Sequence, residues 1–315
     1  MLHQVSKGGM VEKKVIEVEN LVKKYDGVTA VDNASFEVYE GEIFGMVGPN
    51  GAGKTTTIEC IEGLREKDSG TIRVFSQDIS KANQSLKIKI GIQLQESSLP
   101  DKIKVREAME MFSSFYPQTI DWKNLLVKLN LEDKVNSYFR DLSGGQKQRL
   151  FIAIALINNP ELIFLDELST GLDPQARHTM WDLIKDIRNE GKTIFMTTHY
   201  MEEAELLCDR VAIIERGKIV ALDTPQNLIK SLGQEKRLIF SLESEFSVEK
   251  LRKIEGITEV EKIGDRIIIH GREDEFIYRV MSILIKERIK FREIKIEQLN
   301  LEDVFLALTG KKIRE

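Results

Sequence analysis

Short apolar runs recur along the first 230 residues and predict strands that are buried on both faces. Three of them cover 42–47, 162–165 and 193–198. Runs without polar alternation are typical of a parallel sheet that helices cover on both sides. After the first run, Ile58, Ile61 and Leu64 recur at helical spacing. The pattern predicts an α/β fold in which strands and helices alternate.

The stretch between 96 and 143 shows a different, mostly helical pattern. Apolar residues recur at helical spacing over 105–116 and again over 122–129, and Pro117 separates the two segments. A further helix is expected to open near Ser143, which is a good N-cap residue, and to continue through the apolar run 150–157. We therefore expect a helical part inside the α/β domain.

After residue 230 strands and helices follow each other in a new order. The predicted strands cover 237–242, 258–263, 265–270 and 291–296, and the predicted helices cover 248–254, 275–288 and 299–308. Gly264 and Asp265 form a fair hairpin turn between the second and third strands. The order strand-helix-strand-strand-helix-strand is ferredoxin-like. No phosphate loop, metal-ligand spacing or nucleophile set appears in this tail. We expect a small α+β domain that serves packing or dimer support, with a regulatory ligand site as the alternative.

A glycine-rich stretch joins the first apolar run to the first helix. It fits the pattern G-x-x-x-x-G-K-[S/T] of a phosphate-binding loop. Glycines let backbone N–H groups approach phosphate oxygens closely, and a helix N-terminus favours an anion. We expect Lys54 to reach the outer phosphates and the Thr55 hydroxyl to ligate Mg²⁺. The predicted ATP-binding residues of this stretch are Gly48, Pro49, Asn50, Gly51, Ala52, Gly53, Lys54, Thr55 and Thr56.

The two other apolar runs end in polar residues suited to phosphate chemistry. Asp166 and Glu167 directly follow the run 162–165, and His199 follows the run 193–198. Ligands of open α/β sheets gather at the carboxyl ends of strands. We expect Asp166 to hold Mg²⁺, Glu167 to polarise the attacking water, and His199 to contact the γ-phosphate or to hold Glu167 and the water.

A second motif narrows the class of nucleotide-binding protein. Leu142 precedes Ser143, Gly144, Gly145 and Gln146 at the start of the predicted helix. Together with the phosphate loop, this motif resembles the signature of the ATP-binding cassette (ABC) family, over about 15–230. In that family the signature of one subunit faces the phosphate loop of a second. The resemblance implies an ABC-type ATPase fold with a mixed sheet and a helical subdomain, and a dimer that closes around two Mg-ATP.

The same resemblance assigns further residues. Tyr25 corresponds to the aromatic residue that stacks on adenine. Gln95 corresponds to the glutamine that touches Mg²⁺ and takes part in catalysis, and Gln93 stays a competing candidate that fits the preceding strand better. Asp173 belongs to the loop that crosses the dimer interface. Leu168 departs from the family pattern, where many members have proline, and is expected to change the stiffness of that loop more than its chemistry.

Composition limits the other possibilities. The 315 residues allow about two domains, and the net charge of −5 with a pI of about 5.7 argues against a nucleic-acid partner. The two cysteines, Cys60 and Cys208, lack metal-ligand spacing and are expected to be buried and reduced. No apolar run reaches the roughly 18 residues that a membrane span needs. We expect a cytoplasmic protein, peripheral on the membrane, whose separate permease supplies the spans.

We expect three parts along the chain. Residues 1–14 are expected to lie outside the fold, with Met10 as a plausible native start, followed by an ABC ATPase domain at 15–230 with a helical subdomain at about 96–150. A small domain then covers 231–315. This tail resembles the C-terminal domain of drug-export-type ABC ATPases, which implies an exporter of drugs or small lipophilic compounds. The helical subdomain is expected to dock the permease.

Three other functions remain as alternatives. A soluble ABC ATPase of another class would show two cassettes or long coiled coils, and neither pattern is visible. A silent cassette with a sensor tail conflicts with the presence of Lys54, Asp166, Glu167 and His199. A polysaccharide exporter would have an all-β tail, whereas this tail alternates helix and strand.

Overall fold

The computed structural model describes residues 13–81, 83–94, 98–233, 235–243, 247–272 and 275–310. The chain divides after Pro225 into two compact units. Each unit has its own sheets and its own core, and each is described by itself. Among the described residues, no helix is both long enough and apolar enough to span a membrane.

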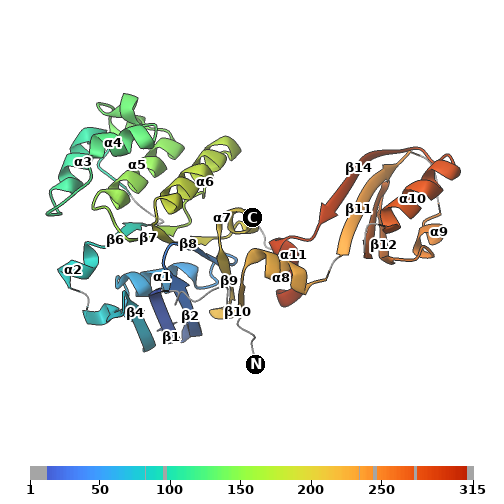
Figure 1. Cartoon of the computed structure of the whole chain (residues 1–315), viewed down its shortest axis with the longest axis horizontal. Coiled ribbons are helices and arrows are strands. Elements are labelled where there is room, and N and C mark those ends of the chain that lie inside the picture. The colour runs from blue at the N-terminus through green and yellow to red at the C-terminus, as the bar shows by residue number, and fades with distance from the viewer. Residues whose placement is uncertain are drawn as a thin grey trace. The chain divides into compact units, whose positions relative to one another are not determined.

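A six-stranded sheet forms the centre of the first unit (Figure 1). Its order is β10-β9-β3-β8-β7-β6, and all neighbours are parallel except β9 and β10. Every residue of β3, β7 and β8 is buried, which confirms the strands expected from the apolar runs. The strands are β3 (Ile43–Val47), β6 (Ile90–Gln93), β7 (Leu162–Asp166), β8 (Thr193–Thr198), β9 (Arg210–Glu215) and β10 (Lys218–Asp223).

A second, antiparallel sheet packs with the first around helix α1 (Lys54–Glu62). Phe36 of this sheet stacks on Phe44 of β3 with ring centroids 5.3 Å apart, and Phe44 lies 5.5 Å from Phe195 of β8. These buried rings join the two sheets through one continuous apolar core. The antiparallel strands are β1 (Lys14–Tyr25), β2 (Val28–Tyr39), β4 (Ser69–Val74) and β5 (Gln77–Asp78), in the order β2-β1-β4-β5.

The helical part of the first unit lies on the other side of the six-stranded sheet from β1, β2 and β4 (Figure 1). Helix α5 begins where expected, because the Ser143 side chain accepts a hydrogen bond from the Gln146 N–H and the Gln146 side chain accepts one from the Ser143 N–H. The helices of this unit are α2 (Gln84–Lys87), α3 (Val105–Ser113), α4 (Trp122–Lys128), α5 (Gly144–Leu156), α6 (Pro174–Asn189) and α7 (Met201–Leu207), with 3₁₀ turns at Ile79–Lys81, Glu132–Lys134 and Phe139–Asp141.

The second unit contains one antiparallel sheet of order β12-β13-β11-β14. This order and the alternation of strands and helices confirm the ferredoxin-like prediction. The helix expected over 248–254 is only one turn long, α9 (Glu249–Arg252). The remaining elements are α8 (Pro225–Ser231), β11 (Glu235–Leu242), β12 (Ile257–Ile263), β13 (Arg266–Arg272), α10 (Glu275–Lys286), β14 (Phe291–Gln298) and α11 (Leu301–Thr309).

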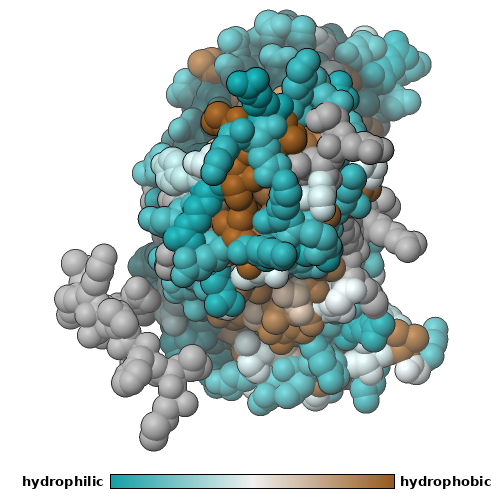
Figure 2. All heavy atoms as spheres, turned by 90° about the vertical axis from the view of Figure 1, so that its right-hand side faces the viewer, coloured by the Kyte–Doolittle hydropathy of each residue, from teal (hydrophilic) through white to brown (hydrophobic). Residues whose placement is uncertain are grey.

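One face of this second sheet is apolar and carries the core of the unit. Phe240 and Ile269 pack with Phe276 and Leu284 of α10, and all four are buried. The face turned to the viewer in Figure 2 is mainly hydrophilic, with a narrow hydrophobic strip between the polar side chains.

Candidate functional site

The loop between β3 and α1 has the backbone that a phosphate-binding loop requires. Gly51 and Gly53 have φ values of 79° and 108°, in the left-handed region that favours glycine. A Cβ on Gly48 would lie 2.2 Å from the Ile214 carbonyl oxygen, and one on Gly53 would lie 2.3 Å from the Ala30 carbonyl oxygen. The glycines are therefore needed for close packing under the loop as well as for its conformation.

Lys54 begins α1 and its ammonium group is held by oxygen atoms. It donates hydrogen bonds to the carbonyl oxygens of Gly48 and Pro49, at 2.9 and 3.2 Å. It also forms an ion pair with Glu167, with 3.0 Å between Nζ and Oε1. Both side chains are buried. A buried ammonium group surrounded by oxygen atoms at the mouth of such a loop is suited to phosphate oxygens, which present the same chemistry.

Asp166 ends strand β7 and lies beside the start of α1. The hydroxyl groups of Thr197 and Thr55 donate hydrogen bonds to its carboxylate. Burial raises the pKa of Asp166, and these two hydroxyl groups oppose the rise. A carboxylate in contact with a hydroxyl is an oxygen donor set that Mg²⁺ prefers. The structure thus brings together Thr55 and Asp166, two of the three residues expected at the metal, from segments far apart in the sequence. The third, Gln95, lies outside the described residues.

Glu167 follows directly and points its carboxylate at two positively charged or chargeable groups. Its Oε1 meets Lys54, and its Oε2 lies 3.3 Å from Nδ1 of His199 and accepts a hydrogen bond from the Thr170 hydroxyl. The His199 imidazole, and after it the Lys54 ammonium, lower the pKa of Glu167 to about 2 although burial opposes them. Glu167 is therefore ionised at neutral pH, as a group that polarises water must be.

The backbone holds Glu167 in an uncommon conformation. Its φ is 48°, and its N–H donates to the carbonyl oxygen and to the hydroxyl of Thr197 at 3.1 Å each. A non-glycine residue with positive φ often marks a functional site, since the surrounding structure must stabilise it. Leu168, the departure from the family pattern, is buried at 1% exposure, so it packs into the protein instead of stiffening an exposed loop.

The signature residues and the predicted interface loop lie together. Ser143, Gly144 and Gly145 line a hollow of about 190 Å³ together with Arg149 and the loop at Gly171–Asp173. Asp173 is the N-cap of α6, and its side chain accepts a hydrogen bond from the Ala176 N–H. Gln146 serves the α5 cap. The structure therefore places a second helix N-terminus next to the loop expected to meet a partner subunit.

Tyr25 and Gln95 are the two other residues that the resemblance assigns to the ATP site. Tyr25 ends β1, and its ring is flanked by the Lys23 ammonium and the Arg65 guanidinium, each 5.3 Å from the ring centroid. Gln95 lies outside the described residues. Gln93 belongs to β6, as its place in the apolar run indicated, and its side-chain amide donates to the Leu94 carbonyl oxygen at 2.7 Å.

Sequence reasoning missed several residues near the site. Arg177 and Tyr200 carry no motif of their own, but the Tyr200 ring lies against His199 and the Arg177 guanidinium lies over the Tyr200 ring. Glu62, near the end of α1, is another: both carboxylate oxygens are buried without a hydrogen-bond partner among the described residues. Burial, and then the charge of Asp166, raises its pKa to about 8. The cysteines are free and buried, as expected.

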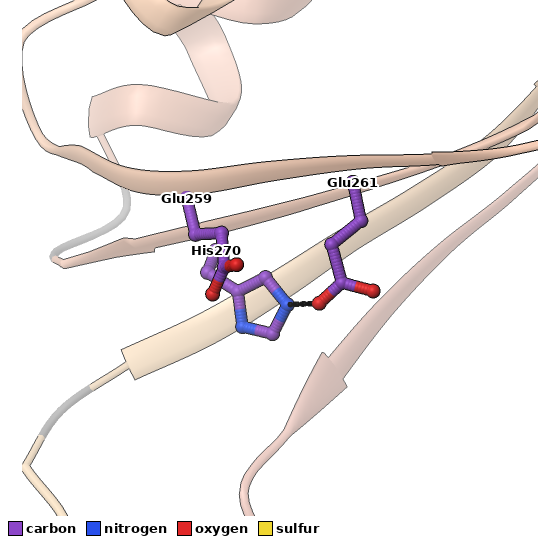
Figure 3. A group of neighbouring side chains, drawn as sticks. All are labelled: Glu259, Glu261 and His270. Carbon is purple, nitrogen blue, oxygen red and sulfur yellow. Dashed lines mark ion pairs between the residues drawn. The ribbon is translucent and has the colours of Figure 1, made fainter.

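The second unit has a small cluster of its own on β12 and β13. Glu259, Glu261 and His270 project from the two paired strands, and their candidate ligand atoms lie within 4.8 Å of one another (Figure 3). His270 Nε2 lies 3.2 Å from Glu261 Oε1. Glu259 is exposed and the other two are half-buried. Within the cluster His270 and Glu261 therefore contact each other, next to the exposed Glu259.

The comparisons with known proteins agree with this geometry. The phosphate loop, the paired carboxylates and the histidine at the ends of parallel strands define a phosphate-loop nucleotide-binding domain. The model of the family described as ABC transporter matches residues 31–170. Nod factor export ATP-binding protein I of Burkholderia lata is 36% identical over 306 residues, which cover 95% of this chain and 98% of that protein.

Solved structures show the same fold. One is cbiO1 of Clostridium perfringens, described as part of the ABC transporter complex cbiONQ, with 26% identity and a TM-score of 0.63 over 70% of this chain and 92% of its own. Another is the dimeric structure of a post-hydrolysis state of an ATP-binding cassette bound to ADP and Pi, with 26% identity and a TM-score of 0.60 over 66% of this chain and 98% of its own. The chain belongs to the ABC transporter family as an ATP-binding subunit, and it is an ATPase.

Proposed function

We propose that two copies of this chain bind two Mg-ATP between them, close, and drive the export of a drug-like or small lipophilic compound through a separate permease. In this proposal Glu167 polarises the attacking water, and His199 holds Glu167 and contacts the γ-phosphate. Gln95 assists at the metal and the water. The dimer acts at the cytoplasmic face of the membrane, with no nucleic acid as a partner.

The observation that carries the proposal is the convergence of Lys54, Asp166, Glu167 and His199. All four lie at one edge of the six-stranded sheet, and Glu167 contacts both Lys54 and His199. Phosphoryl transfer needs positioning and charge neutralisation more than covalent chemistry. An ionised carboxylate beside a lysine and a histidine supplies both, because it orients water while the lysine binds phosphate oxygens.

The metal ion would be held by Thr55 and Asp166, which already contact each other. Bound Mg²⁺ would neutralise charge on the phosphate oxygens. The chain's own contribution is to orient these two oxygen donors. Thr197 does this for Asp166 by donating a hydrogen bond, and the start of α1 does it for Thr55.

The dimer is supported by a site that a single copy leaves incomplete. The phosphate loop lies before α1, while Ser143 to Gly145 line a different hollow with the Asp173 loop. A helix N-terminus is a natural anion site. In the proposed dimer, Ser143, Gly144, Gly145 and Gln146 of one copy complete the ATP site of the other, and Asp173 contacts the partner. Tyr25 stacks on the adenine.

Export and a permease partner rest on the relatives. One relative is named for Nod factor export, and a similar structure belongs to a multi-component ABC transporter complex. The helical part with α3 and α4 is proposed as the permease dock. We propose a packing or dimer-supporting domain over 231–315, a range that contains most of the second unit, while the ATPase domain covers 15–230.

The test is a Glu167→Gln variant. It removes the charge that orients water and keeps the shape, so ATP should bind and hydrolysis should fall by roughly 100-fold or more. The trapped protein should become dimeric in ATP when its mass is measured by light scattering. When it is purified from native membranes with ATP, a multi-helix membrane protein should accompany it.

The matched control adds Ser143→Arg to Glu167→Gln. This double variant should bind ATP with the same affinity and stay monomeric, because the arginine fills the partner's phosphate site. A Glu167→Gln protein that hydrolyses ATP at the wild-type rate would remove Glu167 from the proposed role. Association only with soluble partners would contradict the transport function.

A further inference from the structure

Tyr200 lies directly after His199 and makes close contact with its ring. The ring centroids are 4.1 Å apart with an interplanar angle of 41°. Its backbone N–H donates to the Thr198 hydroxyl at 3.0 Å, which fixes the start of the turn that carries both rings. The imidazole therefore has one face against Tyr200 and its Nδ1 toward Glu167.

The guanidinium group of Arg177 lies over the Tyr200 ring. Its carbon Cζ is 4.2 Å from the ring centroid, which is a close cation–ring contact. Its Nε is buried and has no hydrogen-bond partner among the described residues. A planar guanidinium group stacks well on an aromatic face, and a partly desolvated contact is stronger than an exposed one. Among the described residues, the face of the Tyr200 ring is therefore the contact of this part of the Arg177 guanidinium group.

Arg177 belongs to the first turn of α6. Its N–H donates to the Asp173 carbonyl oxygen at 3.0 Å, and Asp173 is the N-cap of the helix. The stack Arg177–Tyr200–His199 therefore runs from the loop expected at the dimer interface to the imidazole beside Glu167. The contacts are continuous, from the first turn of one helix to the end of strand β8.

We infer that Arg177 and Tyr200 are positioning residues for ATP hydrolysis: they hold the His199 imidazole against Glu167 and make its position depend on the Asp173 loop. The inference rests on the proposed roles of Glu167 and His199. A ring that is held only by Glu167 could rotate away, whereas a ring packed on Tyr200 keeps its Nδ1 near the carboxylate. Movement of the first turn of α6 on dimer closure then reaches the imidazole through Arg177.

The test compares ATPase kinetics of Tyr200→Leu and Tyr200→Phe with wild type. Leucine removes the aromatic face, so kcat should fall roughly 10- to 100-fold, as small misplacements of catalytic groups do. KM and the affinity for a fluorescent ATP analogue should change less than about twofold, because the phosphate loop is untouched. Phenylalanine keeps the face and should retain at least about half of kcat. Arg177→Gln should lower kcat by about 3- to 10-fold, and Arg177→Lys should lower it less.

The matched control is Arg188→Gln, on the same helix α6 but paired with Asp209 at an exposed site. It should leave kcat within about twofold. The decisive measurement repeats Tyr200→Leu in a His199→Ala background. If Tyr200 acts through His199, the double variant should equal His199→Ala within about twofold. A multiplicative loss would show that Tyr200 acts elsewhere and would overturn the inference.

Failure of this inference can be told from failure of the proposed function. If His199→Ala lowers kcat and Tyr200→Leu does not, the stack has no positioning role while the catalytic assignment stands. If His199→Ala itself keeps wild-type kcat, the proposed role of His199 is wrong and the inference falls with it. Unfolding temperatures within a few degrees of wild type are required of each variant, and Tyr200→Phe supplies the aromatic reference if the leucine variant unfolds.

Discussion

The edge of the central sheet and the paired strands β12 and β13 of the second unit carry the same residue types, carboxylates and a histidine, in different surroundings. The first has Asp166, Glu167 and His199 at strand ends, where Asp166 contacts the Thr197 hydroxyl and Glu167 contacts both Lys54 and His199. The second has Glu259, Glu261 and His270 side by side on two antiparallel strands (Figure 3). In the first group Asp166 and Glu167 are buried, whereas in the second Glu259 is exposed and Glu261 and His270 are half-buried.

The difference follows from topology. Parallel strands covered on both faces end at a common edge, so the residues that follow them converge in a partly dry site. An antiparallel sheet with one exposed face presents its polar residues to water, where charges are screened. Glu167 shows the consequence, since its neighbours shift its pKa to about 2. Residue type alone therefore does not make a site, and the packing around the residues does.

The largest effect should come from breaking the phosphate loop that supports the first group. Gly53→Ala places a Cβ 2.3 Å from the Ala30 carbonyl oxygen at a φ of 108°. A backbone atom cannot yield as a side chain can, so we expect a loss of about 4 kcal/mol or more in unfolding free energy. Denaturant unfolding followed by circular dichroism measures it.

Gly51→Ala is the matched control in the same loop. Its φ is 79°, but a Cβ there meets no atom within 4 Å. Only the backbone strain remains, about 1 kcal/mol. Equal losses for the two variants would show that conformation alone, and not the close approach of the Ala30 strand, requires the glycine.

The sequence predicted the parts of this site that follow buried strands. Asp166, Glu167 and His199 directly follow apolar runs, and Lys54 ends the glycine-rich loop that follows another. Such runs mark parallel strands without tertiary information. The long hairpin of β1 and β2 was not predicted, because its alternation is interrupted by bulges near Leu21 and Lys23. The contact of Arg177 with Tyr200 joins different elements, so no local pattern could reveal it.

In the second unit, too, local patterns predict some features, whereas others depend on packing. Its strand order could be predicted because the hairpin turn at Gly264 and the apolar alternation are local. The helix expected over 248–254 forms only from Glu249 to Arg252. Isolated short helices are marginal, and packing decides how far they extend. The site residues of the family pattern thus came from sequence, and their charges and partners came from packing.

An effect of intermediate size should appear in the pH dependence of the stability of the first unit. Burial raises the pKa of Glu62 from its ordinary 4.5 to about 8. Between these values the folded state keeps a proton that the unfolded state has released. The stabilising contribution is therefore complete below about pH 4.5 and is lost as pH rises through 8. Glu62→Gln removes this titration. As pH rises from 5.5 to 8.5, the unfolding free energy of the variant should therefore increase by roughly 2–3 kcal/mol relative to that of the wild type.

The control for Glu62 is Glu66→Gln, which changes an exposed carboxylate four residues further along the chain. Its stability difference from wild type should stay constant within about 0.5 kcal/mol over the same range. Thermal unfolding at several pH values provides both curves. If the difference in stability between Glu62→Gln and wild type did not change with pH, Glu62 would be ionised in the folded protein, and its burial would not raise its pKa.

The smallest effect should come from the second cluster. Glu261→Gln breaks the contact with His270, whose partner atoms are 3.2 Å apart at a site where Glu261 is 42% exposed. Ion pairs of this kind contribute about 0–1 kcal/mol, because solvent screens them and their side chains lose freedom in pairing. The expected change in unfolding free energy is below about 1 kcal/mol, and it should shrink further in 1 M salt. Hydrogen exchange of the β13 amides measures it for this unit alone. A loss of about 3 kcal/mol, the size that a buried pair would show, would place this cluster with the buried group of the first unit and would break the distinction that topology draws between them.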